Sequence, residues 1–328
     1  MERISRQDLY ALVWAEPMIK VATRFGISGV ALAKACRKLD IPVPHRGYWA
    51  KAQNGKRVTQ LPLPPRKLGG VDTVELGRKR WDRYSISDDD LIAMEIPPPH
   101  EFPESLEDLT ARVERMVGKV AIPKNLSKPH HWVAKLLEED EIRKKESSAY
   151  FSRALFGSPF EQRRLRLVSG LFVALNRFGM HCSLYGKDPE SFDIRVGDQH
   201  ISFVVDGLGK TQRSGYRAES ELRRPASETL QLRIDSYLKG MEAVPHLWQD
   251  KPGDLIEKHA RAIVIAVILC GEMNIRLSKH WERGHLIQNK ERAIEAKRKR
   301  EEEERRQARE RQVQAERARV KRLLGEAS

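Results

Sequence analysis

The sequence has few cysteines and few aromatic residues. Its three cysteines in 328 residues are too few and too scattered for a disulfide framework or for a zinc site. Aromatic residues make up 7% of the chain, whereas charged residues make up 32%. This balance indicates much solvated surface, so we expect two domains, or one domain with appendages, rather than one large core.

Long apolar segments are also absent. The longest apolar run, residues 262–270, has about half of the roughly 20 apolar residues that span a bilayer. The first ten residues, MERISRQDLY, lack the apolar core of a secretory signal peptide. These absences predict a cytoplasmic protein without membrane segments.

Positive charge is what the chain has in excess. The sequence contains 60 Lys and Arg residues against 46 Asp and Glu residues, a formal net charge of +14. Residues 1–67 hold 13 basic residues against 4 acidic ones, whereas residues 68–150 are net acidic. A basic excess favours polyanionic partners, and we expect double-stranded DNA rather than an anionic membrane surface.

The basic N-terminal segment carries the start and stop signals of three short helices. Ser5 opens the first helix, residues 5–14, with an S-x-x-D capping box. Pro17 suits the first turn of a second helix, which runs to about residue 25. A third helix, residues 29–39, is followed by two prolines that cannot continue it.

The junction between the second and third helices fits a helix-turn-helix. Ala22 is small enough to let two helices cross closely, Gly26 tolerates a positive φ, and Ser28 can cap the third helix. Apolar residues at helical spacing predict a small core beneath the pair: Val21, Phe25, Ile27, Leu32 and Ala35. The alternative is an ordinary helical hairpin.

Residues 5–44 resemble the helix-turn-helix of bacterial and phage DNA-binding proteins, in a three-helix setting similar to homeodomain-like and recombinase-type modules. The LYxLVWxEPM start, the IPxPxRGYWAK continuation and the charged C-terminal segment also resemble a group of bacterial proteins of prophages and other mobile elements. This second resemblance implies DNA binding and no particular activity.

A recognition helix in the major groove would present the outward residues of the third helix to DNA. The basic segment PHRGYWAKAQNGKR, residues 44–57, is expected to follow the DNA backbone or to enter the minor groove. For Trp49 we favour a short fourth helix, residues 48–54, whose aromatic side chains seal the domain core. The predicted DNA-binding residues are Ser28, Gly29, Val30, Ala33, Lys34, Arg37, Arg46, Lys51, Lys56 and Arg57.

The rest of the chain predicts an α+β fold. Apolar residues at helical spacing predict helices over residues 131–146, 159–178 and 255–275. Between the last two of these lie two short strand-like runs and a hairpin signal at Gly197-Asp198. The four predicted parts are a helix-turn-helix domain with a basic extension (1–60), a proline-rich and acidic linker region (61–128), an antiparallel-sheet α+β domain for dimerisation, partner binding or ligand binding (129–287), and a long charged, solvent-exposed helix (288–328).

Catalytic patterns in the α+β part are weak. Asp193 and Asp206 flank the hairpin and Lys210 follows, but the E-x-K or D-x-K spacing of many nucleases is missing. His130-His131 has no partner at metal-ligand spacing and is expected at a helix start. We therefore expect no catalytic residue, no metal and no cofactor.

The sequence thus predicts a sequence-specific DNA-binding protein of the nucleoid. Its expected role is that of a transcriptional regulator or mobile-element accessory factor, acting as a homodimer or with a partner protein through the α+β domain or the C-terminal helix. The alternative is a nuclease-like or phage-defence component with catalysis in the α+β domain.

Overall fold

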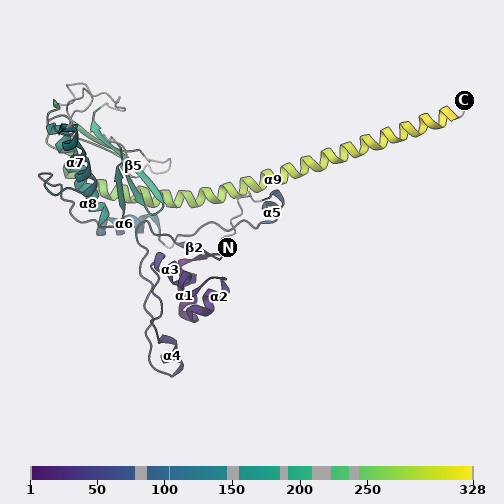
Figure 1. Ribbon diagram of the computed structural model, residues 1–328, viewed down its shortest axis with the longest axis horizontal. Helices are drawn as coiled ribbons and strands as arrows, with labels where there is room; N and C mark the ends of the chain where they lie inside the picture. Colours follow the sequence, from purple (N-terminus) through teal and green to yellow (C-terminus); the bar gives the residue numbers. More distant parts are fainter. Residues whose placement is uncertain are drawn as a thin grey trace. The chain divides into compact units, whose positions relative to one another are not determined.

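The computed structural model describes residues 2–77, 87–102, 104–145, 155–184, 191–208, 223–235 and 244–326. It has the predicted mixture of helices, one larger antiparallel sheet and a long C-terminal helix (Figure 1). The chain divides into two units, Met1–Lys79 with Phe102–Arg276, and Arg80–Glu101 with Leu277–Ser328.

Three helices near the N-terminus lie where the sequence predicts them: α1 (Arg6–Ala15), α2 (Met18–Arg24) and α3 (Gly29–Lys38). The Ser5 side chain accepts a hydrogen bond from the Asp8 amide, which confirms the predicted cap of α1. Beneath the helices lies an apolar core, and all five predicted core residues are buried in it or packed against it.

A two-stranded sheet extends this N-terminal module, the described residues 2–77. Strand β1 (Glu2–Ser5) pairs antiparallel with β2 (Thr73–Leu76), and the side chains of Ile4 and Leu76 are buried in the module core. Strand β2 lies in the range 61–128, which the sequence predicts to be a linker. Pairing across some 70 residues leaves no local pattern in the sequence, which is why it was not predicted.

The predicted linker region contains further packed structure. Helix α6 (Leu106–Met116) buries Leu109 and Val113 completely. Arginine side chains satisfy backbone carbonyls of the irregular segments nearby: Arg261 donates to Val117 O at 2.8 Å, and Arg276 donates to Glu104 O at 2.8 Å. Proline favours extended backbone but does not prevent packing when side-chain donors replace the missing backbone bonds.

The larger sheet is an antiparallel meander, β3-β4-β5-β6-β7. Val196 pairs with Gln199, so Gly197 and Asp198 form the predicted two-residue turn, with Gly197 at φ +66°. The five strands are β3 (His181–Leu184), β4 (Ser191–Val196), β5 (Gln199–Gly207), β6 (Leu230–Ile234) and β7 (Leu247–Gln249).

One face of this sheet forms the core of the helix-and-sheet region, the described residues 104–276. The Phe172 ring of α8 (Pro159–Asn176) meets the rings of Phe192 and Phe203 edge-on, at centroid distances of 6.0 and 6.2 Å. Gly271 of α9 (Ala260–Glu326) lies so close to Val196 that an added Cβ would be 2.4 Å from its side chain. Helix α8 and the first part of α9 therefore cover the same face (Figure 1).

A close glycine contact joins the N-terminal module to the helix-and-sheet region. A Cβ on Gly197 would lie 2.1 Å from the carbonyl oxygen of Gly69. The fully buried Glu272 of α9 accepts from the Gly69 amide at 2.6 Å and from the Arg66 guanidinium. The proline-rich stretch thus continues directly into a packed junction.

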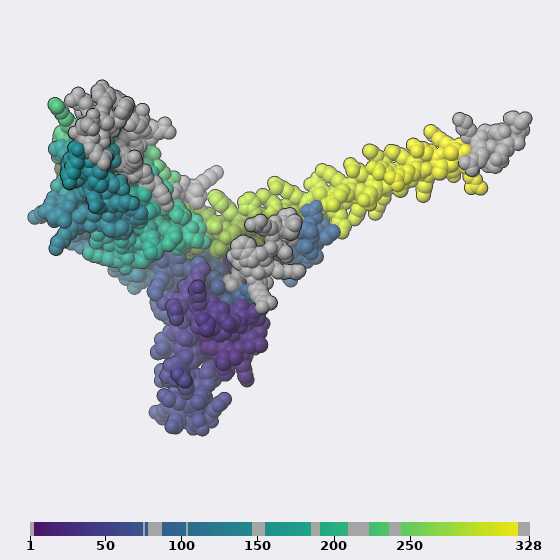
Figure 2. Space-filling view, in the orientation of Figure 1, coloured from purple at the N-terminus to yellow at the C-terminus, as the bar shows by residue number. Residues whose placement is uncertain are grey.

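Helix α9 is longer than expected. The sequence predicts two helices, residues 255–275 and 288–328, whereas one helix follows the 3-10 turn η2 (Ile256–His259) without a break up to Glu326. Residues 297–320 are exposed at every position, as predicted for a charged helix (Figure 2).

In the second unit, α5 (Asp88–Ala93) places acidic side chains beside basic ones of α9. Arg300 contacts Asp88 at 2.6 Å, and Lys290 donates to Met94 O at 2.7 Å.

Helix α7 (His131–Lys145) completes the described helices outside the N-terminal module, together with α5, α6, α8 and α9. Among the described helices, none has an apolar stretch long enough to cross a membrane.

Candidate nucleic-acid interface

The turn between α2 and α3 is closed by backbone hydrogen bonds. The Ile27 amide donates to Ala22 O at 3.0 Å and the Gly26 amide donates to Thr23 O at 3.0 Å, the pair of bonds that defines a Schellman motif. Gly26 has φ +63°, a left-handed conformation that glycine adopts without strain. The predicted reason for a glycine at this position is confirmed.

Ser28 starts α3 as predicted. Its Oγ accepts from the Ala31 amide at 3.1 Å, so one of the free donors of the first turn is satisfied. Leu32 and Cys36 are buried on the inner side of the helix, where burial raises the pKa of the Cys36 thiol to about 11. The opposite side of α3 is left to solvent.

The outer side of α3 carries the predicted contact residues. Val30 is 81% exposed, and Ser28, Lys34 and Arg37 are also exposed, whereas Gly29 and Ala33 are partly buried. Lys34 and Arg37 make no hydrogen bond or ion pair with any residue that the structure describes. They are separated by three positions, about one helical turn, so both cations point to the same side.

Arg6 fixes the far end of α3. Its Nε donates to Leu39 O at 2.6 Å, and its Nη2 donates to Asp40 O at 3.1 Å and to Pro64 O at 2.9 Å. A cation at a helix C-terminus satisfies free carbonyls and interacts favourably with the helix dipole. Burial lowers the pKa of Arg6, with Asp40 and Asp72 acting in the opposite direction. No local sequence signal links Arg6 to α3.

The segment 44–57 forms the short helix α4 (Tyr48–Gln53), preceded by Gly47 at φ +85°. The Tyr48 ring is buried edge-on against Trp14 at 5.2 Å, and Trp49 packs against the same core. The favoured interpretation of Trp49 is therefore confirmed.

The cations of the same segment remain outside the core. Arg46, Lys51, Lys56 and Arg57 are exposed and have no ion-pair partner in the described part of the chain. The module therefore presents free cations on α3 and along the α4 segment. Sequence reasoning missed Lys38, which is also exposed and makes no ion pair with a described residue, although its position four residues after Lys34 was a usable signal.

The two aspartates considered for a nuclease site do not meet. Asp193 lies opposite Ser202 in the β4–β5 ladder, and Asp206 is four residues further along β5, about 13 Å away at the usual rise per residue. Asp193 contacts His200, whereas Asp206 contacts Arg224. Lys210 lies outside the described residues.

Comparison with known proteins gives no relative for this chain. No family model, no curated protein and no solved structure matches it.

Proposed function

We propose that this chain is a DNA-binding protein in which α2 and α3 act as a helix-turn-helix and α3 enters the major groove. The observation that carries the proposal is the pair of cations Lys34 and Arg37 on the outer side of α3, which are exposed and have no partner among the described residues. The capped, rigid turn that precedes α3 holds this side in a fixed orientation.

The residues of α3 divide into positioning and reading roles. Lys34 contacts a phosphate, because a flexible ammonium group suits a point-like anion. Arg37 contacts a guanine, because its planar guanidinium matches the O6 and N7 acceptors of that base. Val30 and Ala33 can offer only van der Waals contact, for example to a thymine methyl group.

Few bases can be read by such a surface alone. The exposed cations of the α4 segment add backbone contacts or reach the minor groove. A second copy or a partner protein, bound through the helix-and-sheet region or α9, supplies a second half-site. This is the arrangement of a transcriptional regulator or mobile-element accessory factor of the nucleoid.

The test begins with sequencing the DNA that is crosslinked to the protein in cells, which provides the specific duplex. Salt titrations then compare the DNA affinities of two variants, Lys34→Ala and Arg37→Ala, on this duplex and on a scrambled duplex. Lys34→Ala should weaken binding to both duplexes and reduce the salt slope by about one. Arg37→Ala should cost about 1–3 kcal/mol on the specific duplex and relax the choice at one base pair.

A matched control is Arg24→Ala on α2, whose guanidinium is already paired with Glu16 at 2.6 Å. This variant should bind both duplexes like the parent protein. If the Lys34 and Arg37 double variant also binds like the parent, α3 does not lie in the groove and the proposal fails.

A further inference from the structure

Three basic side chains form one row across the larger sheet, outside the proposed DNA interface. Arg195 on β4 lies directly opposite His181 on β3 and directly opposite His200 on β5. Residues paired in this way project to the same face of a sheet, with neighbouring strands about 4.8 Å apart. Their neighbours Cys182, Ile194 and Ile201 are buried, so the row faces away from the α8 core.

Arg195 has no partner inside the described part of the protein. Its guanidinium is exposed and makes no hydrogen bond or ion pair with a described residue, and the same holds for the His181 ring. Other arginines of the region are engaged: Arg163 binds Asp250 and Glu257, and Arg233 binds Asp235. An arginine left free between two histidines offers a fork of donors to an external anion.

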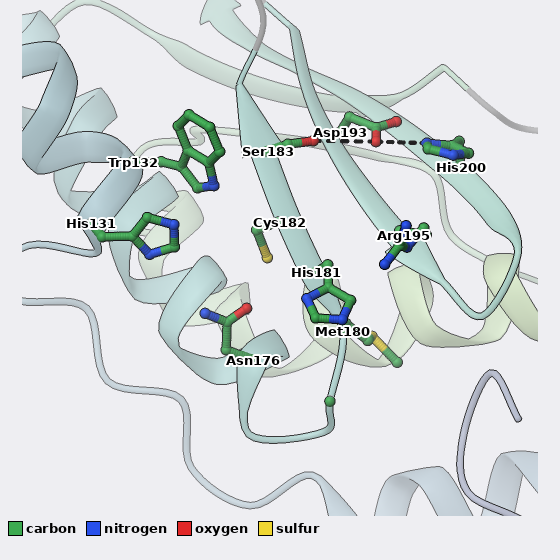
Figure 3. A pocket seen from close by; sticks show the side chains of 11 residues that line it. His131, Trp132, Asn176, Met180, His181, Cys182, Ser183, Asp193, Arg195 and His200 are labelled. Carbon is green, nitrogen blue, oxygen red and sulfur yellow. Dashed lines mark hydrogen bonds and ion pairs between the residues drawn. The ribbon is translucent and has the colours of Figure 1, made fainter. Parts of the chain in front are cut away.

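A second row of side chains, centred on Asp193, lies beside the row of His181, Arg195 and His200 and contacts it. Asp193 lies opposite Ser183 and Ser202, two residues from Arg195 along β4. Asp193 is only 6% exposed, and its Oδ2 accepts from His200 Nδ1 at 2.9 Å and from Ser183 Oγ at 3.4 Å. The carboxylate therefore fixes the His200 ring through Nδ1, and no described residue makes a hydrogen bond with its Nε2 (Figure 3).

These side chains line a cavity of about 670 Å³ at the β3 edge of the sheet. Its other wall comes from the start of α7, with the rings of His131 and Trp132, and from Asn176 at the end of α8 (Figure 3). A cavity of this volume holds a small organic ligand. A basic row at one side and flat aromatic rings at the other suit a molecule with a phosphate and a planar ring.

His130, next to this wall, has a different role. It is buried, its ring meets Phe172 edge-on at 5.1 Å, and its Nε2 lies 2.7 Å from the Asn176 side chain. Burial lowers its pKa to about 4, with the neighbouring His131 acting in the same direction. His130 is therefore a neutral packing residue near neutral pH that holds Asn176 in place.

We propose that this cavity binds a nucleotide, with the phosphate on the row of His181, Arg195 and His200 and the base against His131 and Trp132. Asp193 is a positioning residue that acts through His200. The site lies close to the junction with the N-terminal module, because Gly197, which packs on Gly69, follows Arg195 by two residues. This inference does not depend on the proposed DNA binding.

The test is calorimetric titration of the full chain with the four nucleoside 5′-monophosphates, with the parent nucleosides, and with inorganic phosphate. We expect at least one nucleotide to bind saturably and more tightly than inorganic phosphate or its own nucleoside. Arg195→Gln should weaken the nucleotide and inorganic phosphate by about 10-fold to 100-fold, the usual effect of losing a hydrogen bond to a charged group.

Trp132→Ala should distinguish the base-binding wall from the phosphate-binding row. It should weaken binding of the nucleotide and leave binding of inorganic phosphate unchanged. Arg233→Gln, on β6 two strands away from Arg195 and already paired with Asp235, is the matched control and should bind like the parent. Hydrogen exchange of β4 and β5 verifies that each variant is folded. The proposal is overturned if none of the four nucleotides binds saturably at millimolar concentration, or if folded Arg195→Gln binds like the parent.

Discussion

Helix α3 of the N-terminal module and the start of α8 in the helix-and-sheet region use their basic side chains in opposite ways. In the module, Lys34 and Arg37 lie exposed and without a partner among the described residues. In the helix-and-sheet region, Arg163, Arg164 and Arg224 are buried and bound to carboxylates. A net charge of +14 therefore does not show where a polyanion can bind, because the buried cations are already neutralised.

The buried charges form a connected network around the N-terminus of α8. Glu161 and Arg164 are both completely buried and lie 2.7 Å apart. Arg224 contacts Asp206 at 2.9 Å and stacks on the Phe160 ring at 3.6 Å. The fold loses stability when one partner of such a pair is removed, because the other is left as an uncompensated charge in a medium of low polarity.

The largest expected effect comes from breaking this network. Arg164→Met keeps much of the side-chain volume but removes the guanidinium 2.7 Å from Glu161, whereas Arg224 lies further from this carboxylate, at 3.4 Å. We expect a loss of about 3–5 kcal/mol in the stability of the helix-and-sheet region. Hydrogen exchange in increasing urea, read on β5 and β6 peptides, measures this loss.

The same substitution in the other region sharpens the comparison. Arg37→Met should change the stability of the N-terminal module by no more than about 0.5 kcal/mol, because an exposed, unpaired cation contributes little to folding. Equal effects of the two substitutions would contradict the division between structural and available arginines.

A smaller effect is expected from the turn of the N-terminal module. Gly26→Val places a β-branched residue at φ +63°, although its Cβ would meet no atom within 4 Å. Backbone strain alone should therefore cost about 1–2 kcal/mol, measured by hydrogen exchange of α2 and α3.

Gly29→Ala is the control for Gly26→Val, because Gly29 lies inside α3, has no positive φ and also has open space around it. Alanine there should stabilise the helix slightly or leave it unchanged. The sheet peptides should keep their protection in both variants. A matching loss of protection in β4 and β5 would show that the contact of Gly69 with Gly197 couples the two regions into one folding unit.

The sequence predicts structure well wherever a signal is local. Ser5 and Ser28 cap helices, Gly26 takes a positive φ, and Gly197 with Asp198 makes a two-residue turn. Each of these features depends on residues only a few positions apart, so composition and spacing are sufficient.

Long-range features are not accessible in this way. The β1–β2 pairing and the role of Arg6 at the end of α3 join residues more than 30 positions apart. The row of His181, Arg195 and His200 depends on the register of three strands, and a shift of one residue would place these side chains on the other face. Sequence reasoning identified Asp193 as notable but paired it with Asp206, because it lacked this register.

The smallest effect should come from the charged end of α9. Residues 297–320 are exposed at every position, and pairs within the helix, such as Lys299 with Glu295 at 2.8 Å, support it. Residues 288–328 hold 14 basic residues against 9 acidic ones, so they add only a weak attraction to DNA.

Truncation after Gln288 should therefore leave affinity for the specific duplex nearly unchanged and lower affinity for scrambled DNA, measured by salt titration. Replacing Lys297, Arg298, Lys299 and Arg300 by glutamine in the full chain should reproduce the loss on scrambled DNA, because charge and not length is its cause. Complete loss of specific binding on truncation would instead show that α9 assembles the two copies that bind the site.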